Sequence, residues 1–444
     1  MHAAAPIRFA LKAALVLVLL GGLFLLLRPQ PEYGFAALEA DGFGADSYAG
    51  AMAQREKALS VEAERVDLQS DSWLALEREA MARYTLGKLS GDFGQMDRAY
   101  RQLQDARALA PQGSGPELSA ALLAFAMHRL DDTETALDAL DTRAVRPTAG
   151  ERSEILGIRG DVAFYRGDYA RARGLYEEAL SIDSHPGLHV RLANWHQRMG
   201  DLDAALASFE QAAASGGKVS PELASTLFLY AGGAHLKRGD WDAATDLFER
   251  ADAVFPGYWL TQAHLAQMEA ARGDMDAAEA RYRAILAEHD EPSVMAAFAP
   301  VLEAQGNRRD AEAMARRAEA IFMAQARDYP EAFADHVLDG ALSASDLEAA
   351  MAAARSNHAG RPYGDSKVGV ARAMIAAGEP ERARALLDTV HRSGWRSTEQ
   401  YLATADACAK LGDEDCVTQA ERRARAFNKM AMAEGSDFLA FGNH

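Results

Sequence analysis

One short phrase recurs along the sequence and constrains the fold more than any other feature. In its clearest copies a Gly is followed by Asp and, five residues after the Gly, by Ala; these copies begin at Gly167, Gly200, Gly239 and Gly273. With that last residue as a marker, ten copies are found: Ala99, Ala136, Ala172, Ala205, Ala244, Ala278, Ala311, Ala349, Ala383 and Val417. Successive markers are 33 to 39 residues apart. Such a regular period predicts an array of stacked structural repeats.

The residues of the phrase predict two helices joined by a tight turn. A Gly ends the first helix because it reaches the left-handed conformation without a steric penalty. The Asp or Asn that follows is placed to cap the second helix. Gly94 takes the Gly position before Ala99, whereas the copies at Ala136 and Ala349 lack the Gly. Each marker is small where two helices cross closely, and in many copies a large apolar residue follows four positions later.

This pattern resembles the tetratricopeptide repeat (TPR), whose period is about 34 residues. The resemblance extends over residues 72–432, and Pro111 and Pro256 stand where that family has its helix-ending proline. It implies an all-α protein: a right-handed superhelical solenoid of about ten helix–turn–helix units. Residues 46–71 are expected to form an N-terminal capping helix, and residues 433–444 a C-terminal tail. The resemblance also implies a scaffold or adaptor that binds a protein or peptide partner.

The N-terminus predicts a membrane anchor. Arg8 and Lys12 precede an apolar run that ends at Leu27. A cleaved signal peptide is the alternative, but no pair of small residues follows the run, so we favour an uncleaved transmembrane helix. Residues 1–28 would then be a cytoplasmic tip and anchor, and residues 29–45 a linker. The positive-inside rule places the N-terminus in the cytoplasm, so we expect a single-pass protein of the bacterial inner membrane with a periplasmic repeat domain. There the expected role is assembly or maturation of an envelope complex.

Charge and motif searches narrow the classes of function. Lys and Arg number 47 against 65 Asp and Glu, which gives a net charge of −18 and makes nucleic acid an unlikely partner class. The sequence has no phosphate-binding loop, nucleophile elbow or zinc-protease motif. We therefore expect no catalytic residues, no cofactor and no small-molecule substrate. The alternatives are an enzymatic or metal-binding solenoid and a cytoplasm-facing regulator.

The resemblance also implies which residues line a partner-binding groove. Carrying the family's groove positions onto this sequence selects six residues of the expected first helices: Tyr165, Arg191, Asn194, Tyr230, His264 and Gln267. Aromatic and Arg side chains on such a wall are suited to anchoring a peptide. The alternative for Tyr165 and Tyr230 is packing between repeats.

Two small sets of residues are candidates for other chemistry. His185, His189 and His196 are the densest histidine group, and the first two could share a helix face and hold a metal ion. No further ligand completes the set, so we favour ordinary surface histidines and expect no metal. Cys408 and Cys416 flank a predicted helix turn and are close enough in sequence to form a disulfide in an oxidising compartment.

Overall fold

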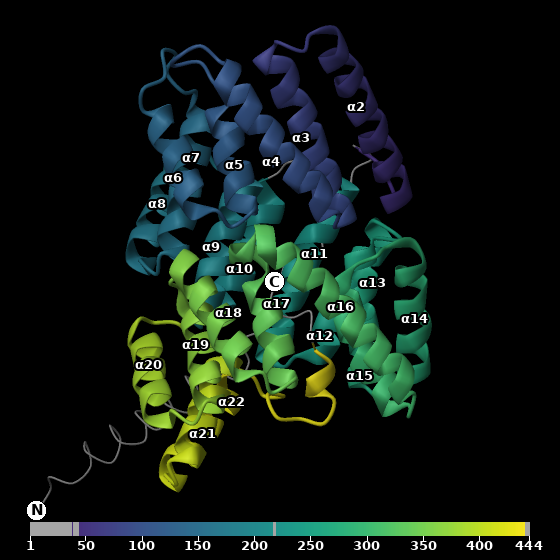
Figure 1. The fold of residues 1–444 in the computed structure, drawn as a ribbon, viewed down its shortest axis with the longest axis vertical. Coiled ribbons are helices and arrows are strands. Elements are labelled where there is room, and N and C mark those ends of the chain that lie inside the picture. Colours follow the sequence, from purple (N-terminus) through teal and green to yellow (C-terminus); the bar gives the residue numbers. More distant parts are fainter. Residues whose placement is uncertain (1–37, 39–43, 216–218, 440–444) are drawn as a thin grey trace, which may run out of the picture. The chain divides into compact units, whose positions relative to one another are not determined.

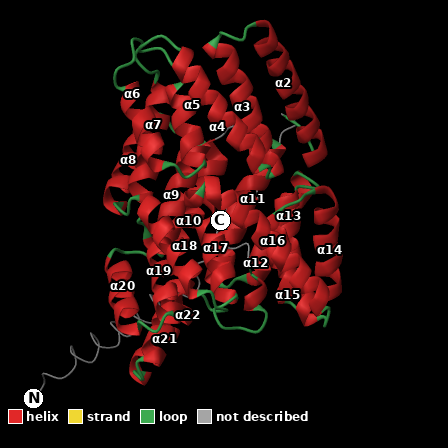
Figure 2. Cartoon of the chain, in the orientation of Figure 1, coloured by secondary structure: helices red, strands yellow, loops and turns green. Residues whose placement is uncertain are grey.

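The computed structural model describes residue 38, residues 44–215 and residues 219–439. These residues form twenty-one α-helices and one short 3-10 helix, joined by loops and without any strand (Figure 2). All contacts discussed below lie within Glu39–His444, which is one compact unit. The predicted all-α class is confirmed.

Ten helix pairs follow α2 (Tyr48–Leu68) along the chain (Figure 1). Numbered as units 1 to 10, the pairs are α3 (Trp73–Ser90) with α4 (Phe93–Leu109), α5 (Glu117–Ala126) with α6 (Leu130–Leu140), α7 (Ala149–Tyr165) with α8 (Tyr169–Ile182), α9 (Pro186–Arg198) with α10 (Leu202–Ser215), α11 (Pro221–Arg238) with α12 (Trp241–Val254), α13 (Trp259–Ala271) with α14 (Met275–Glu288), α15 (Pro292–Ala304) with α16 (Arg308–Asp328), α17 (Pro330–Ser343) with α18 (Leu347–Gly360), α19 (Gly364–Ala376) with α20 (Pro380–Arg392), and α21 (Thr398–Lys410) with α22 (Glu414–Phe427). In units 1 to 8 the two helices of a pair pack more extensively against each other than against the next pair, and unit 9 packs about equally against unit 10. The ten predicted units are therefore present, while the right-handedness of their path stays a prediction.

All ten turns within these pairs share one backbone feature. Two residues before the second helix begins, the chain has a positive φ. Eight of these positions hold Gly: Gly91, Gly167, Gly200, Gly239, Gly273, Gly306, Gly378 and Gly412. The other two are His128 and Ser345, each with φ 59, in the two units whose Gly is missing from the sequence pattern. The turn geometry is thus kept even where the residue disfavours it.

Two details of the predicted pattern are corrected. Gly94 lies inside α4, and the turn of unit 1 is made by Gly91, so α4 begins one helical turn earlier than the phrase suggests. In unit 8 the buried small residue is Ala350, with no exposed surface, whereas Ala349 is only partly buried. The shift arises because Ser345 and Asp346 form the turn there, and Asp346 caps α18 by accepting from the Ala349 N–H.

The array folds back so that units distant in sequence touch. In each of units 2 to 5, the turn between the two helices contacts the chain at the start of the unit six further on. For unit 5 this is the chain that follows α22, where an eleventh unit would begin. Three hydrogen bonds mark this register: Gly364 N–H to Tyr169 Oη (2.9 Å), Arg396 N–H to the Arg198 carbonyl (2.8 Å) and Lys429 N–H to the Arg238 carbonyl (3.2 Å). In unit 2 the corresponding contact is Arg129 over the ring of Tyr329, 6.0 Å from its centroid.

We call these contacts between early and late units the closure of the array, and Trp395 is the largest side chain in it. It has no exposed surface, and its ring centroid lies 5.8 Å from Phe164, 5.7 Å from Tyr169 and 5.6 Å from Tyr363. Gly364, at the start of α19, packs directly against the indole. Residues of units 3, 9 and 10 therefore share one core.

Helix α2 occupies most of the segment predicted as a cap. It packs on α3 and also reaches units 5 and 6. The Tyr48 N–H donates to the Pro256 carbonyl (3.1 Å), and Arg55 pairs with Glu222 at 2.8 Å. Tyr48 is buried in the same core as Trp259. The helix therefore covers the side of unit 1 and helps to close the array.

The predicted membrane localisation is corrected. Among the residues that the structure describes, no helix is both long enough and apolar enough to cross a bilayer. The longest of them, α2 and α16, each have 21 residues and carry many charged side chains. The predicted anchor, residues 1–28, lies outside the described residues.

The closure can be tested by adding one methyl group. In Gly364→Ala the new Cβ would collide with the Trp395 indole, which cannot move because it is enclosed by three aromatic rings. We expect this overpacking to lower the free energy of unfolding by about 1–3 kcal/mol. Chemical denaturation followed by circular dichroism measures it.

Gly174→Ala is the matched control. Gly174 lies within α8 and has no neighbouring atom near its Cβ position, so the added methyl raises helix propensity without a clash. This variant should be as stable as the original chain or more stable, by up to about 1 kcal/mol. Equal stability of both variants would rule out a tight closure at Trp395.

Candidate functional site

Two cavities lie among the helices of the array, and we name them by size. The small cavity, about 310 Å³, lies between α2, α3, α9, α11 and α13. Its walls include Tyr84, Lys88, Asn194, Tyr230, Lys237 and His264. The large cavity, about 1370 Å³, is bordered mainly by α15, α16, α17 and α19. Its walls include Tyr165, Glu303, Glu319, Asp335, Arg361 and Asp365. These two cavities therefore differ more than fourfold in volume.

Four of the six residues predicted to line a groove lie on these cavities. Asn194, Tyr230 and His264 border the small cavity, and Tyr165 borders the large one. Tyr230 is 38% exposed, which is unusual for a large aromatic residue in the described chain. Burial among neighbouring groups nevertheless raises the pKa of its phenol, because it disfavours the charged form. The exposed ring therefore forms part of the wall of the small cavity.

The other two predicted groove residues lie outside both cavity walls. Gln267 has no exposed surface and bonds to His264 Nδ1 at 2.8 Å. Arg191 donates to Asp161 (2.8 Å) and to Glu154 (2.7 Å). Burial raises the pKa of Asp161, whereas for Glu154 burial is outweighed by Arg191, and its pKa falls. Arg191 therefore holds the neighbouring first helices α7 and α9 together, whereas the Gln267 bond lies within α13.

Sequence reasoning missed Lys88 and Lys237, although a signal for both was present. The predicted groove residues stand 14, 11 or 7 positions before their marker. Lys88 stands 11 before Ala99, as Asn194 does before Ala205, and Lys237 stands 7 before Ala244, as Tyr165 does before Ala172. Applying the same offsets to units 1 and 5 would have selected both lysines.

Arg361 organises one end of the large cavity. Its side chain, 4% exposed, pairs with Asp335 at 3.4 Å and lies 5.9 Å from the Tyr165 ring centroid. Burial raises the pKa of Asp335 to about 6, although Arg361 opposes the shift. His128 borders the same cavity, and burial together with Arg361 lowers its pKa to about 3. Its Nδ1 is buried and has no hydrogen-bond partner among the described residues.

The three histidines considered as metal ligands are separately engaged. His185 lies 3.6 Å from Glu154, His189 bonds to Ser184 at 2.9 Å, and the His196 ring packs edge-on against Trp195. Throughout the described part of the chain, no group of three or more His, Cys, Asp or Glu side chains is arranged to hold a metal ion. The expectation of no metal stays a prediction.

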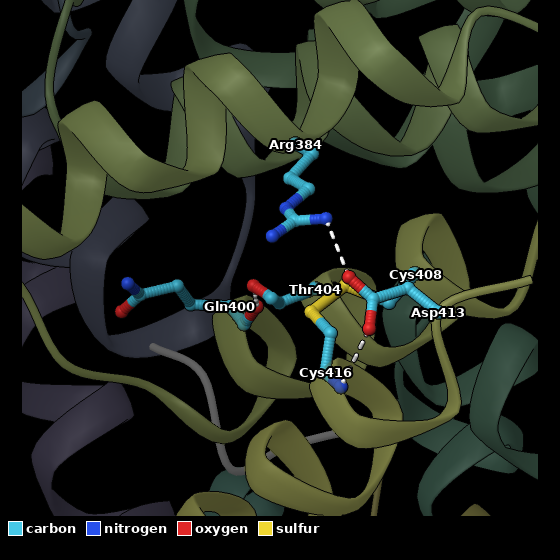
Figure 3. The surroundings of a disulfide bond; sticks show 6 residues. All are labelled: Arg384, Gln400, Thr404, Cys408, Asp413 and Cys416. Atoms are coloured by element: carbon cyan, nitrogen blue, oxygen red, sulfur yellow. Dashed lines mark hydrogen bonds and ion pairs between the residues drawn. A yellow bond between two sulfur atoms is a disulfide. The ribbon is translucent and has the colours of Figure 1, made fainter. Parts of the chain in front are cut away.

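Cys408 and Cys416 form a disulfide in the structure (Figure 3), with Cα atoms 5.8 Å apart. The bond joins the end of α21 to the start of α22 across the Gly412 turn. Beside it, Asp413 accepts from the Cys416 N–H (3.1 Å) and from Arg384 (2.9 Å). The disulfide therefore fastens the last unit of the array.

Comparison with known proteins identifies part of the array. Residues 235–299 and residues 188–218 each match a family described as tetratricopeptide repeat. The chain thus contains TPR units, and the all-helical fold is consistent with a TPR solenoid. TPR solenoids typically mediate protein–protein interaction, so binding of a protein partner is supported at that level.

Two solved structures are similar to the chain. One is the crystal structure of the APC/C hetero-tetramer Cut9–Hcn1: 15% identity, 89% of this chain and 84% of that chain covered, TM-score 0.39. The other is the crystal structure of MamA: 19% identity, 38% of this chain and 96% of that chain covered, TM-score 0.30. No curated protein matches the chain.

The disulfide is expected to stabilise the last unit locally. It closes a short loop, with its cysteines eight positions apart, and on a chain-entropy basis such a link contributes about 2–3 kcal/mol. In Cys408→Ala/Cys416→Ala, amide hydrogen exchange in α21 and α22 should therefore quicken. Amides of α3 and α4 are the internal control and should be unaffected, and unchanged exchange in unit 10 would contradict this role.

His128 predicts a pH dependence of stability with a defined sign. Between pH 6.5 and pH 3 the unfolded chain binds a proton at His128 that the folded chain does not, so this residue lowers the free energy of unfolding as pH falls. His128→Asn keeps a residue that tolerates positive φ and removes the titration. Relative to the original chain, the variant should gain about 2 kcal/mol between pH 7 and pH 5.

Denaturant titrations of both proteins at the two pH values measure this difference. Because other histidines titrate in both proteins, only the change in the difference reports on His128. A difference in stability that is the same at pH 7 and pH 5 would contradict the assignment.

Proposed function

We propose that this protein is a scaffold that binds a polypeptide partner, and that a basic, partly apolar segment of the partner occupies the large cavity. The observation that carries the proposal is the size of this cavity, about 1370 Å³. Small-molecule sites usually enclose about 300–1,000 Å³, so this space suits a stretch of polypeptide better.

The charges of the large cavity support a basic partner. Its walls carry eight carboxylates and four arginines. Three of the arginines are already paired within the wall: Arg198 with Asp365 (3.0 Å), Arg361 with Asp335 (3.4 Å) and Arg372 with Asp339 (2.8 Å). Glu303 and Glu319, both exposed, have no ion pair among the described residues. Lys or Arg side chains of a partner would meet these carboxylates, and opposite potentials favour correct encounter.

The cavity also offers apolar contact surface. Met323 is 46% exposed, and Ala296, Pro300 and Ala315 are exposed on α15 and α16. Met side chains adapt to different partners because they are flexible and polarisable. A segment that alternates basic and apolar residues would satisfy both kinds of surface. The TPR units found in the chain fit this proposal, since that fold typically binds proteins.

A matched pair of peptides tests the charge preference. One peptide alternates Lys, Ser and Leu, and the other has Glu in place of each Lys. We expect the basic peptide to bind more tightly, as measured by fluorescence anisotropy at physiological ionic strength. In Glu303→Lys/Glu319→Lys the affinity for the basic peptide should fall about tenfold, because two attractions become repulsions.

The control variant reverses two charges elsewhere. Glu178 and Glu249 are exposed in the middle of α8 and α12, away from both cavities, so Glu178→Lys/Glu249→Lys changes the net charge equally. It should bind the basic peptide as the original chain does. Equal loss in both variants would show that only net charge matters, and equal binding of both peptides would refute the proposed partner chemistry.

A further inference from the structure

The small cavity is lined by hydrogen-bonding groups that the described chain does not satisfy. The Gln197 side chain borders it, is 7% exposed, and makes no hydrogen bond with the described residues. The Asn194 amide, one turn earlier on α9, also makes no hydrogen bond with the described residues. The same holds for the hydroxyls of Tyr84 and Tyr230. Gln197 is the buried member of this set, whereas Asn194 and Tyr230 are exposed, so the cavity wall presents polar groups that a ligand could reach.

Two ammonium groups in the same walls also lack an anion. Lys88 on α3 and Lys237 on α11 form no ion pair within the part of the chain that the structure describes. The Lys88 Nζ lies over the ring of Tyr84, 5.9 Å from the ring centroid. The cavity wall carries one carboxylate, Glu222, and both of its oxygens accept from Arg55 at 2.8 Å. The small cavity therefore presents an excess of positive charge in a protein whose net charge is −18.

The surroundings of the two lysines show what an anion would change. Burial lowers the pKa of both, and that of Lys237 falls to about 7. Around Lys237, Arg198 lowers the pKa further while Asp365 and Glu399 raise it. Around Lys88, Glu222 raises the pKa while Arg191 and Arg55 lower it. The neighbouring carboxylates thus do not compensate burial, and at Lys237 the charged form is disfavoured above about pH 7.

We propose that the small cavity binds a small organic anion bearing carboxylate or phosphate groups, whose charge is met by Lys88 and Lys237 and whose oxygens accept from Asn194 and Gln197. The volume, about 310 Å³, lies at the lower end of the range for small-molecule sites. The donors outnumber the acceptors in the wall, which suits an oxygen-rich ligand. This site is separate from the large cavity and does not depend on the polypeptide partner proposed above.

The site predicts a coupling between anion binding and protonation. A bound anion stabilises the charged form of Lys237, so binding takes up a proton when the solution is above pH 7. The affinity should accordingly fall as pH rises above 7, by up to about tenfold per pH unit. Below that pH the lysine is already charged and the affinity should change little.

Citrate and inorganic phosphate are the probes, with glycerol as a neutral comparison, all at constant ionic strength. We expect saturable binding of at least one anion in isothermal titration calorimetry and a matching rise in the thermal midpoint of unfolding. In Lys88→Met/Lys237→Met the binding should weaken at least about tenfold, because two charge-assisted contacts are lost. The same variant without anion should be as stable as the original chain or more stable, since Lys88 is exposed and Lys237 is a partly buried charge whose pKa is lowered.

The stability of the double lysine variant without anion distinguishes a ligand site from a structural role. If the lysines stabilise the fold, the double variant will be less stable without anion, and the proposal fails. Lys57→Met/Lys410→Met, at two exposed positions, is the control and should retain anion binding. Asn194→Ala/Gln197→Leu provides a second variant that keeps both charges and should also weaken binding.

One arm of the experiment distinguishes the source of the anion. An acetylated and amidated Gly-Glu-Gly peptide presents a carboxylate on a polypeptide. Binding of this peptide without binding of citrate or phosphate would overturn the small-molecule site in favour of a protein carboxylate. If citrate, phosphate and the Gly-Glu-Gly peptide all fail to bind saturably, the anion site is overturned altogether. The basic-peptide test of the large cavity would be unaffected by that result.

Discussion

The docking of early turns onto later units is the constraint on which the rest of the structure depends. A repeat array held together only by neighbouring units would leave its first helices open along one side. Here the turns of units 2 to 5 each contact chain six units further on, and Trp395 is enclosed by residues of units 3 and 9. These long-range contacts enclose the space between first helices, and that enclosure turns an open surface into two cavities with distinct walls.

The repeat period and the turn chemistry made most of the fold predictable. Eight of the ten turns hold a Gly with positive φ, and the sequence pattern identifies all of these Gly residues except Gly91, for which it selects Gly94. The turns of the other two units could not be recognised, because His128 and Ser345 adopt the same backbone conformation although they are not Gly. Their marker positions could be estimated only from spacing, which explains the one-residue error at Ala349. Contacts between units six apart leave no periodic trace, so the closure could not be predicted.

The candidate site was predictable in position but not in role. Offsets from the marker identify residues on the inner side of the first helices, and Asn194, Tyr230 and His264 do border the small cavity. The same offset that selects Asn194 also selects Gln267, which has no exposed surface because it packs against its neighbours. Position within a repeat decides the direction of a side chain. Whether that direction ends in a cavity or in packed core depends on what the closure brings opposite it.

The net charge of the protein and the charge of a single cavity wall can predict different ligands. The excess of carboxylates disfavours nucleic acid as a partner, and the walls of the large cavity share that excess. The small cavity has the opposite balance, because its single carboxylate is already occupied by Arg55. The Arg198–Asp365 pair (3.0 Å) borders the large cavity, and both of its members act on the charge of Lys237 in the small one. Two sites with opposite preferences can therefore lie close together in one array, since each is governed by the few groups that face it and by their burial rather than by the total charge.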